Sequence, residues 1–323
     1  MPRLKVNERE SGQRLDRFLK RTLPRMPMGH IFKLIRTRKV RVNGKRAAAG
    51  RLLQAGDEVL LHISEQQFAS ERRVVERRAS SLDFEVRYED EDLLVVSKPP
   101  FLPVHPGAGH PDNSLIDQVH AYLEVARAGD DLRPALVHRL DRDTSGLLLI
   151  GKNYAAVRRL GDMFKQGRIA KYYLALCRGV PRPPRGTWEF AVARRDDAGR
   201  PRGKAPAAGR TSYRVASRRQ LHDQGRVVCQ VSLLVLRLHT GRTHQIRSHL
   251  LQAGHPLGGD RRYGDREFNR LLTRRFDLRR QFLHAYRLRL EHPLSGKPLE
   301  LVDPYPDDLQ VMTRALHLGI PPA

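Results

Sequence analysis

Residues 135–150 read ALVHRLDRDTSGLLLI and predict a polar loop held between two strands. Two apolar runs of strand character bracket the loop, which spans 138–146. The loop carries two carboxylates, Asp141 and Asp143, and a sheet that holds it at both ends would fix them rigidly, as catalysis requires. Its composition fits a structural polar turn equally well, so both interpretations stay open at this point.

A second stretch, 238–264, reads LHTGRTHQIRSHLLQAGHPLGGDRRYG and predicts a strand, a turn and then a helix. Arg247 falls within the first turns of that helix. Three histidines in this stretch recur every five residues, at 239, 244 and 249. That spacing does not stack ligands on one helix face, so no metal site is predicted.

Two further stretches place polar groups at strand ends. In 89–110 a buried strand ends at Lys98-Pro99-Pro100, because proline cannot continue the hydrogen-bond ladder. A purely structural end of a strand explains this pattern at least as well as a functional site does. In 168–179, RIAKYYLALCRG, Tyr172 and Tyr173 begin an alternating strand. Adjacent strand residues face opposite sides, so one tyrosine can face a cleft while the other packs or meets solvent.

Outward from these stretches, the segment 83–310 predicts an α+β domain with a mostly antiparallel mixed sheet flanked by helices and loops. The expected strands are 93–96, 135–137, 147–150, 172–177, 227–238 and 282–290. The expected helices are 114–128, 154–166 and 243–253, the last capped by Gly254. Residues 194–210 are rich in Gly, Pro and Arg and are expected to form an exposed basic loop, to which no role beyond its charge is assigned.

The segment 12–63 predicts a small separate domain of two short helices and an antiparallel sheet, with a hairpin at Asn43-Gly44. From Gly12 to Arg46 there are 12 Lys or Arg residues and one acid, a density that indicates contact with a phosphate backbone. A merely solvated helix face is the alternative. Residues 64–82 are expected to be a linker, or a short exposed helix. The predicted RNA-binding side chains are Arg14, Arg17, Lys33, Arg36, Arg38, Lys39, Arg41 and Lys45.

The composition of the whole chain also indicates a negatively charged partner. The 323 residues include 60 Lys or Arg, 49 of them Arg, against 35 acids, and the net charge is +25. Such a balance favours a polyanionic partner, nucleic acid first, although a generally Arg-rich proteome would also produce it. No apolar run reaches membrane-spanning length and the N-terminus has no secretory h-region, so a cytoplasmic protein is expected.

Several kinds of chemistry find no support. Cys177 and Cys229 are two lone thiols, which predict neither a disulfide framework nor a zinc site. Gly-rich nucleotide-binding motifs and H-E-x-x-H are absent, so no cofactor and no metal are expected. The G-x-S-x-G pattern that marks a nucleophilic serine is missing around Ser145. A glycosidase would need two carboxylates that flank the glycosidic bond. Asp143 could supply the second one by its position in the sequence, but neighbouring loop carboxylates face different ways.

The four stretches together resemble the RluA family of RNA pseudouridine synthases. HRLDRDTSG resembles the family's catalytic motif, and DLLVVSKPP, KYYLALCRG and HTGRTHQIRSH resemble its other core motifs, in the family's order. The N-terminal segment resembles an S4 RNA-binding domain. RRYGDREFNRLL and FLHAYRLRLEHP resemble the RluC-type branch, which modifies large-subunit ribosomal RNA.

The resemblance implies a pseudouridine synthase fold, an isomerase that needs no cofactor, and large-subunit ribosomal RNA or its assembly intermediates as partner. It implies no obligate protein partner, and we expect a monomer. The same chemistry on transfer RNA or at another ribosomal site stays open, and so does a non-catalytic ribosome-binding factor.

The resemblance also assigns roles. Asp141 becomes the catalytic aspartate, Arg247 the cation that keeps it ionised, and Tyr173 the active-site tyrosine. Arg139 becomes the residue that fills the space left by the flipped uridine, although a salt bridge to Asp143 is its alternative. The implied substrate-binding side chains are Arg139, Arg142, His138, Thr144, Ile246 and Arg242.

Overall fold

The structure is a computed structural model that describes residues 1–23, 26–72, 82–106, 113–123, 134–192 and 206–319. The chain divides into two compact units. The first consists mainly of Met1–Arg78, and the second contains Ala79–Val119, Ala135–Lys152 and Ala156–Ala323. The domain boundaries 12–63, 64–82 and 83–310 stay predictions.

The first unit contains a four-stranded antiparallel sheet in the order β1-β4-β2-β3. Its elements are β1 (Arg3–Lys5), the 3-10 helix η1 (Glu8–Glu10), α1 (Leu15–Thr22), α2 (Met28–Arg36), β2 (Val40–Val42), β3 (Lys45–Arg46), β4 (Glu58–Leu61) and α3 (Glu65–Arg72). The predicted helix pair and small sheet are confirmed. Strand β1 was not predicted, because three residues are too few to show an alternating pattern. Helix α3 supplies the short helix considered for the linker.

The hairpin between β2 and β3 turns at the predicted dipeptide. Asn43 and Gly44 both have positive φ, 51° and 71°, which matches the twist that a two-residue hairpin turn needs. The two helices bury one face each, with Leu15, Leu19 and Ile31 inaccessible to solvent in the core of this unit. Arg17 of α1 and Lys33 and Arg36 of α2 are thereby left exposed, whereas Asp16 of α1 is buried.

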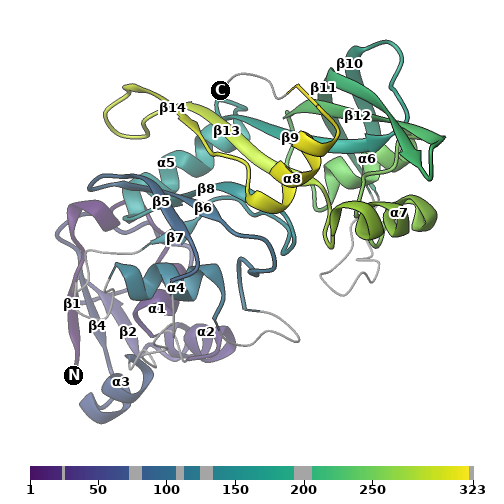
Figure 1. Ribbon diagram of the computed structural model, residues 1–323. Coiled ribbons are helices and arrows are strands. Elements are labelled where there is room, and N and C mark those ends of the chain that lie inside the picture. The colour runs from purple at the N-terminus through teal and green to yellow at the C-terminus, as the bar shows by residue number, and fades with distance from the viewer. Residues whose placement is uncertain (24–25, 73–81, 107–112, 124–133, 193–205, 320–323) are drawn as a thin grey trace. The chain divides into compact units, whose positions relative to one another are not determined.

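The second unit is organised around a ten-stranded mixed sheet (Figure 1). Its strands are β5 (Glu85–Glu89), β6 (Leu93–Lys98), β7 (Ala135–Leu136), β8 (Ser145–Gly151), β9 (Ala170–Arg178), β10 (Arg185–Val192), β11 (Ala207–Asp223), β12 (Arg226–Leu238), β13 (Leu283–Glu291) and β14 (Pro298–Val302). The main order is β10-β11-β12-β9-β13-β8-β6-β5, with β7 beside β8 and β14 beside β13. Among the described strands only β8 and β13 pair in parallel, which confirms the mostly antiparallel mixed sheet.

Among the described residues, five helices lie wholly or mainly in this unit: α4 (Leu115–Tyr122), α5 (Tyr154–Lys165), α6 (Gln245–Gln252), α7 (Arg266–Phe276) and α8 (Asp307–Ala315). Helix α6 ends as expected, with Gly254 at φ 76° directly after its last turn. Helices α7 and α8 were not among the predicted elements. In the part of the chain that the structure describes, no helix is both long and apolar enough to cross a membrane.

The basic loop expected at 194–210 is corrected in part. Residues 207–210 belong to β11 and pair with β10, Val192 opposite Ala207 and Glu189 opposite Arg210. The segment is polar because one side of this edge hairpin faces solvent, and backbone ladder bonds rather than apolar side chains hold it. Residues 193–205 lie outside the described part of the chain.

Candidate active site

The loop between β7 and β8 lines a cavity of about 700 Å³. Asp141 lies in the cavity wall, together with Tyr173 from β9 and Arg242 and His244 from the turn before α6. These segments are far apart in sequence, and the β8–β13–β9–β12 order of the sheet brings their ends together. The cavity is formed within the second unit alone.

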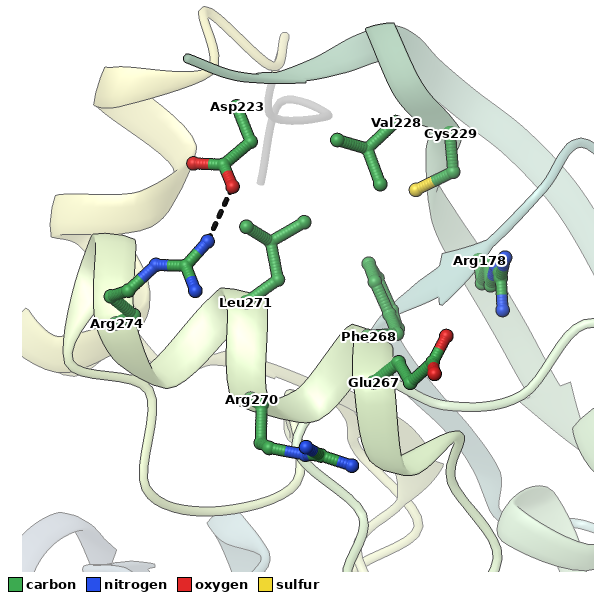
Figure 2. Close-up of a pocket in the computed structure, with 9 residues that line it drawn as sticks. All are labelled: Arg178, Asp223, Val228, Cys229, Glu267, Phe268, Arg270, Leu271 and Arg274. Atoms are coloured by element: carbon green, nitrogen blue, oxygen red, sulfur yellow. Dashed lines mark hydrogen bonds and ion pairs between the residues drawn. The ribbon is translucent and has the colours of Figure 1, made fainter. Parts of the chain in front are cut away.

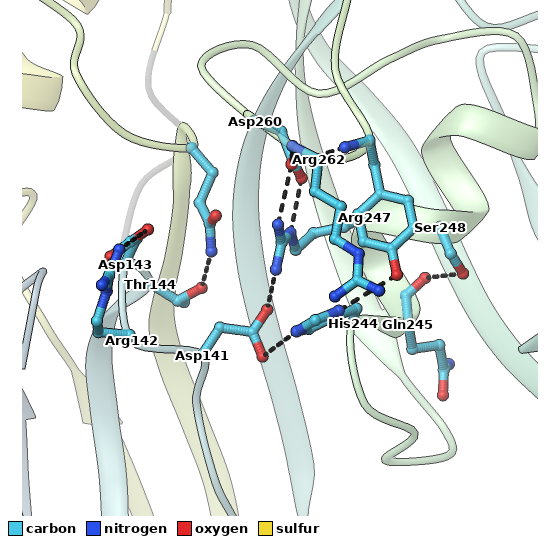
Figure 3. A network of polar contacts seen from close by, with 12 residues as sticks. Asp141, Arg142, Asp143, Thr144, His244, Gln245, Arg247, Ser248, Asp260 and Arg262 are labelled. Atoms are coloured by element: carbon cyan, nitrogen blue, oxygen red, sulfur yellow. Dashed lines mark hydrogen bonds and ion pairs between the residues drawn. The ribbon is translucent and has the colours of Figure 1, made fainter. Parts of the chain in front are cut away.

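Asp141 and Arg247 form the expected ion pair across the edge of this cavity (Figure 3). Arg247 Nη1 donates to Asp141 Oδ2 at 2.9 Å. The Arg247 side chain is 9% exposed and the Asp141 side chain 18%, so the carboxylate reaches the cavity while its cation lies behind it. The guanidinium thus places a positive charge directly against this carboxylate.

Asp260 fixes Arg247 from the other side. Its carboxylate accepts two bonds from the guanidinium, from Nε at 2.6 Å and from Nη2 at 2.9 Å, and its side chain is fully buried. Burial alone would raise the pKa of Asp260, but the Arg247 fork and the backbone amides of Tyr263 and Arg262 outweigh it and lower that pKa. Asp260 therefore stays ionised and leaves Nη1 of Arg247 directed at Asp141.

The charge on Arg247 is correspondingly secure. Burial lowers the pKa of a guanidinium, but the bonds and negative charges of Asp260 and Asp141 overcompensate and raise the pKa of Arg247. Sequence reasoning missed Asp260, although it is the only acid in HPLGGDRRYG. A lone acid among arginines, directly after two glycines, was the available signal.

His244 approaches Asp141 from a second direction. Its Nε2 lies 3.8 Å from Asp141 Oδ1, and its Nδ1 lies 3.2 Å from the Tyr263 hydroxyl. Burial lowers the pKa of His244, so the imidazole is neutral near pH 7 and Arg247 carries the charge opposite Asp141. The Tyr263 ring in turn lies 5.1 Å from the Arg247 guanidinium carbon. The sequence analysis had weighed His244 only as a metal ligand.

Tyr173 and Lys171 share one face of β9, two residues apart, and both line the cavity. Tyr172 faces the other side and packs against an apolar cluster. Burial, reinforced by the negative charge of Asp141, raises the pKa of Tyr173, which therefore remains a phenol. The Lys171 ammonium lies 4.7 Å from the centre of the Phe164 ring, and burial lowers its pKa to about 8. No carboxylate of the described residues pairs with it.

Two buried cations hold the backbone of the Asp141 loop. Lys98, at the end of β6, donates to three carbonyls, those of Pro99 at 2.6 Å, Arg142 at 2.9 Å and Leu102 at 3.0 Å. Three acceptors match the three N–H donors of an ammonium, although burial lowers the pKa of Lys98 to about 7.

The second clamp is Arg280, which is anchored by a two-bond fork to Asp308 and donates to the Asp143 carbonyl at 3.3 Å. The loop then leaves into β8 through Gly146, at φ 118°. A Cβ there would lie 2.3 Å from the Ala285 carbonyl oxygen, so only glycine fits.

The predicted substrate-binding residues fall into two groups. Arg139, Arg142 and Arg242 are exposed around the loop and the turn, and Arg142 donates to Asp143 at 2.6 Å. The side chains of the other three are less accessible to a substrate: His138 is half-buried, and Thr144 and Ile246 are buried. His138 Nε2 accepts from the Leu149 amide at 3.0 Å, and burial lowers its pKa to about 3, so it is a neutral part of the cavity wall.

Ser145 makes no accessible nucleophile. Its hydroxyl lies 3.0 Å from His284 Nδ1, and His284 Nε2 lies 3.7 Å from Asp303, an arrangement that resembles a catalytic triad. All three residues are nearly inaccessible to solvent, so the arrangement ties strands together. Among the described residues, no group of three or more His, Cys, Asp or Glu side chains could hold a metal ion.

The eight predicted RNA-binding residues of the first unit are all exposed. Arg14 donates two bonds to Asp16 at the start of α1, so part of its charge is neutralised. The other seven form no ion pair with the described residues: Arg17, Lys33, Arg36, Arg38, Lys39, Arg41 and Lys45. Their charge is therefore available to an external partner.

Comparisons with known proteins agree with this geometry. The family model described as RNA pseudouridylate synthase matches residues 92–252, and that of the S4 domain matches residues 13–59. Ribosomal large subunit pseudouridine synthase C of Vibrio vulnificus is 33% identical, covering 97% of this chain and 95% of the relative. Synthase D of Vibrio parahaemolyticus is 35% identical, covering 97% and 93%.

A solved structure shows the same fold. Human RNA pseudouridylate synthase domain containing 4 superposes with a TM-score of 0.58 at 25% identity, covering 73% of this chain and 94% of that one. The full-length likeness and the motif-bearing cavity agree on one activity, the isomerisation of uridine in RNA. The chain belongs to the RluA family of RNA pseudouridine synthases and carries an N-terminal S4 domain.

Proposed function

We propose that this enzyme converts uridines of large-subunit ribosomal RNA to pseudouridine, with Asp141 as the catalytic carboxylate. The observation that carries the proposal is the Asp141–Arg247 pair in the wall of a cavity that Tyr173 also lines. Relatives named as synthases C and D of the ribosomal large subunit, both aligned over nearly the whole chain, support the choice of RNA. The same names support a cytoplasmic location, where ribosomes are found. We expect a monomer.

The chemistry requires one bond to break and another to form. The C1′–N1 bond of uridine opens, and its electron pair leaves with the uracil ring. Asp141 either adds to C1′ or takes the 2′ proton, and both routes need it ionised, as Arg247 arranges. The ring then turns and C5 bonds to C1′, while the Asp141–C1′ bond breaks or, on the other route, Asp141 returns the 2′ proton to C2′. The C5 proton then departs and N1 gains a proton. No electrons are gained or lost overall.

Tyr173 fits two successive tasks. While Asp141 is charged, the phenol stays protonated, because that charge and burial raise its pKa. In this state the ring is a stacking surface for uracil. Once Asp141 has formed its bond or taken a proton, the opposing charge is gone and the phenol gives up its proton more easily. It can then pass that proton to N1 of the turned ring and accept the C5 proton as phenolate.

Arg139 lies two residues before Asp141 and is exposed beside the cavity. A uridine must leave its stack to enter, at an expense of a few kcal/mol. A guanidinium can stack on the neighbouring bases and contact phosphate at once. We assign Arg139 to the vacated space in the RNA.

Lys171 provides a pH-dependent prediction. Its buried ammonium faces the cavity into which the negatively charged uracil departs, and its pKa of about 8 means that the charge is lost above that pH. We expect kcat/KM to fall about tenfold per pH unit above pH 8. Lys171→Arg should abolish this fall, because a guanidinium stays protonated.

The measurement is kcat/KM across about pH 6 to 9.5 for wild type and Lys171→Arg, with Lys165→Met as the control. Lys165 lines the same cavity but is exposed and pairs with Asp162. An alkaline fall of equal steepness in Lys171→Arg would exclude Lys171 as its source.

The S4 domain gives a second prediction. Replacing Arg36, Lys39 and Arg41 with glutamine should weaken RNA binding and reduce the slope of log K against log salt by roughly two to three, because each phosphate contact contributes about 0.7–0.9. All three are exposed, so folding should be unaffected. The check is a binding isotherm at several salt concentrations. An unchanged slope would remove this face from the RNA contact.

The target is tested in cells that lack the protein. Pseudouridines in ribosomal and transfer RNA are mapped by carbodiimide modification and reverse transcription stops. Marks missing only from large-subunit RNA, and restored by the wild type but not by Asp141→Asn, support the proposal. Marks missing only from transfer RNA would redirect it to that substrate, and a complete set of marks would refute it.

A further inference from the structure

A second basic surface lies on helix α7, away from the cavity of Asp141. It is a groove of about 680 Å³ that we call the α7 groove. Its arginines are Arg261, Arg266, Arg270, Arg274 and Arg279. The remaining lining residues are uncharged, so no carboxylate of the described residues forms part of its wall.

Three of these arginines repeat every fourth residue along α7, at 266, 270 and 274. Residues with this spacing are neighbours on one helix face, and like charges there destabilise the helix. Arg266 and Arg270 are exposed and pair with no carboxylate of the described residues. An uncompensated cluster of this kind is explained by a partner that supplies the missing negative charge.

A neighbouring hollow beside α7, which shares Arg270 and Arg274 with the groove, contains carboxylates as well as arginines. It has a volume of about 260 Å³ and contains Asp223 and Glu267 among its lining residues. Figure 2 shows Arg274 turned toward Asp223, whereas Arg270 points away from it. Arg274 and Arg279 of the α7 groove are thus compensated, by Asp223 and Asp277. The charges of Arg266 and Arg270 are left open to a partner.

The α7 groove is connected to the catalytic network by hydrogen bonds. Asn269 of α7 accepts from the Gly259 amide and donates to the Asp260 carbonyl, both at 2.8 Å. Asp260 is the residue that holds Arg247. One residue further on, Arg261 lines the groove. The groove is therefore fixed to the turn that anchors the cation of Asp141.

We propose that the α7 groove binds the phosphodiester backbone of the substrate RNA, at nucleotides that flank the one in the cavity. Guanidinium groups form two-bond contacts with phosphate oxygens, and such contacts set position without reading base sequence. The proposal rests on the proposed function for the identity of the RNA. It adds a second RNA-contacting surface to that of the S4 domain.

The test is the double variant Arg266→Gln, Arg270→Gln in the full chain, bound to a transcript of large-subunit ribosomal RNA. Two lost phosphate contacts should reduce the salt slope by about 1.4–1.8. The wild type should then lose about tenfold more affinity than the variant between roughly 50 and 200 mM salt. KM should rise, and kcat at saturating RNA should not change, because neither side chain touches the cavity.

The matched control is Arg218→Gln, Arg219→Gln on β11, which removes the same charge from exposed positions outside the groove. A salt slope that falls equally in both double variants, or in neither, would overturn the proposal. Arg270→Glu alone is the second variant, and it should weaken binding more than Arg270→Gln does. If the wild type binds the transcript without modifying it, the proposed target fails, while the slopes still decide whether the groove binds RNA.

Discussion

Asp141→Asn is expected to abolish pseudouridine formation while the protein remains folded and bound to RNA. The amide can neither add to C1′ nor accept the 2′ proton, so the single-turnover rate should fall by at least about 10⁴-fold. Affinity should hold or improve slightly, because a negative charge is removed from a surface that meets a polyanion. The measurement is release of tritium from RNA labelled at C5 of uridine, beside a binding isotherm.

Asp143→Asn is the matched control. Asp143 lies two residues away in the same loop, but it pairs with Arg142 rather than Arg247. We expect it to keep most of its activity. Equal loss in both variants would point to a carboxylate pair, as a glycosidase uses. Activity of Asp141→Asn within tenfold of wild type would end the assignment of Asp141.

Arg247→Ala should produce the second-largest loss, and it should affect stability as well as rate. The substitution leaves Asp260, which is fully buried, without its cation. Removing one partner of a buried ion pair is destabilising by about 3–5 kcal/mol. Asp141 also loses the charge that favours its ionised form, so the single-turnover rate should fall by about 10³-fold or more. Denaturant unfolding and single-turnover kinetics measure the two effects separately.

The pH dependence of that stability loss has a defined sign. Because the pKa of Asp260 is lowered in the folded protein, the stabilisation from its pair with Arg247 is complete above the unfolded value of about 3.9. This stabilisation is lost as the pH falls through the lower pKa that Asp260 has in the folded protein. In Arg247→Ala the burial that raises the pKa of Asp260 is no longer offset by the guanidinium. The difference in unfolding free energy between wild type and this variant should therefore begin to narrow above about pH 4 and keep narrowing as the pH falls through the lowered pKa of the wild type.

Arg247→Lys separates charge from geometry. A lysine restores one positive charge but cannot bond Asp260 with a fork and Asp141 at the same time. Relative to Arg247→Ala, we expect Arg247→Lys to recover part of the unfolding free energy but much less of the single-turnover rate. If Arg247→Ala had the same unfolding free energy as the wild type, the buried Asp260 would not depend on this guanidinium for its stability.

Local patterns predicted the parts of the site that lie within single motifs. The loop that carries Asp141 and Asp143 was found because apolar strands bracket it, and the hairpin at Asn43-Gly44 because that dipeptide tolerates positive φ. The choice of Asp141 over Asp143 came from the family resemblance. The ion pair with Arg247 joins residues 106 positions apart and was reached only through the family resemblance. Periodicity alone cannot reveal a contact of that separation.

The missed features depend on tertiary packing. Asp260 and His244 acquire their roles only when the turn before α6 and the turn before α7 meet the Asp141 loop. Lys98 was interpreted as a strand end, although its ammonium holds a carbonyl 44 residues away. Strand β11 was taken in part for a loop because its solvent-facing residues mask its alternation.

The way in which the loop is held has an evolutionary consequence. Lys98 and Arg280 donate hydrogen bonds to the main-chain oxygens of Arg142 and Asp143, not to their side chains. Any amino acid offers the same oxygen at these two positions. The side chains next to Asp141 can thus change in evolution while Asp141 stays in place, so descendants of this enzyme can acquire new substrate preferences without rebuilding the loop.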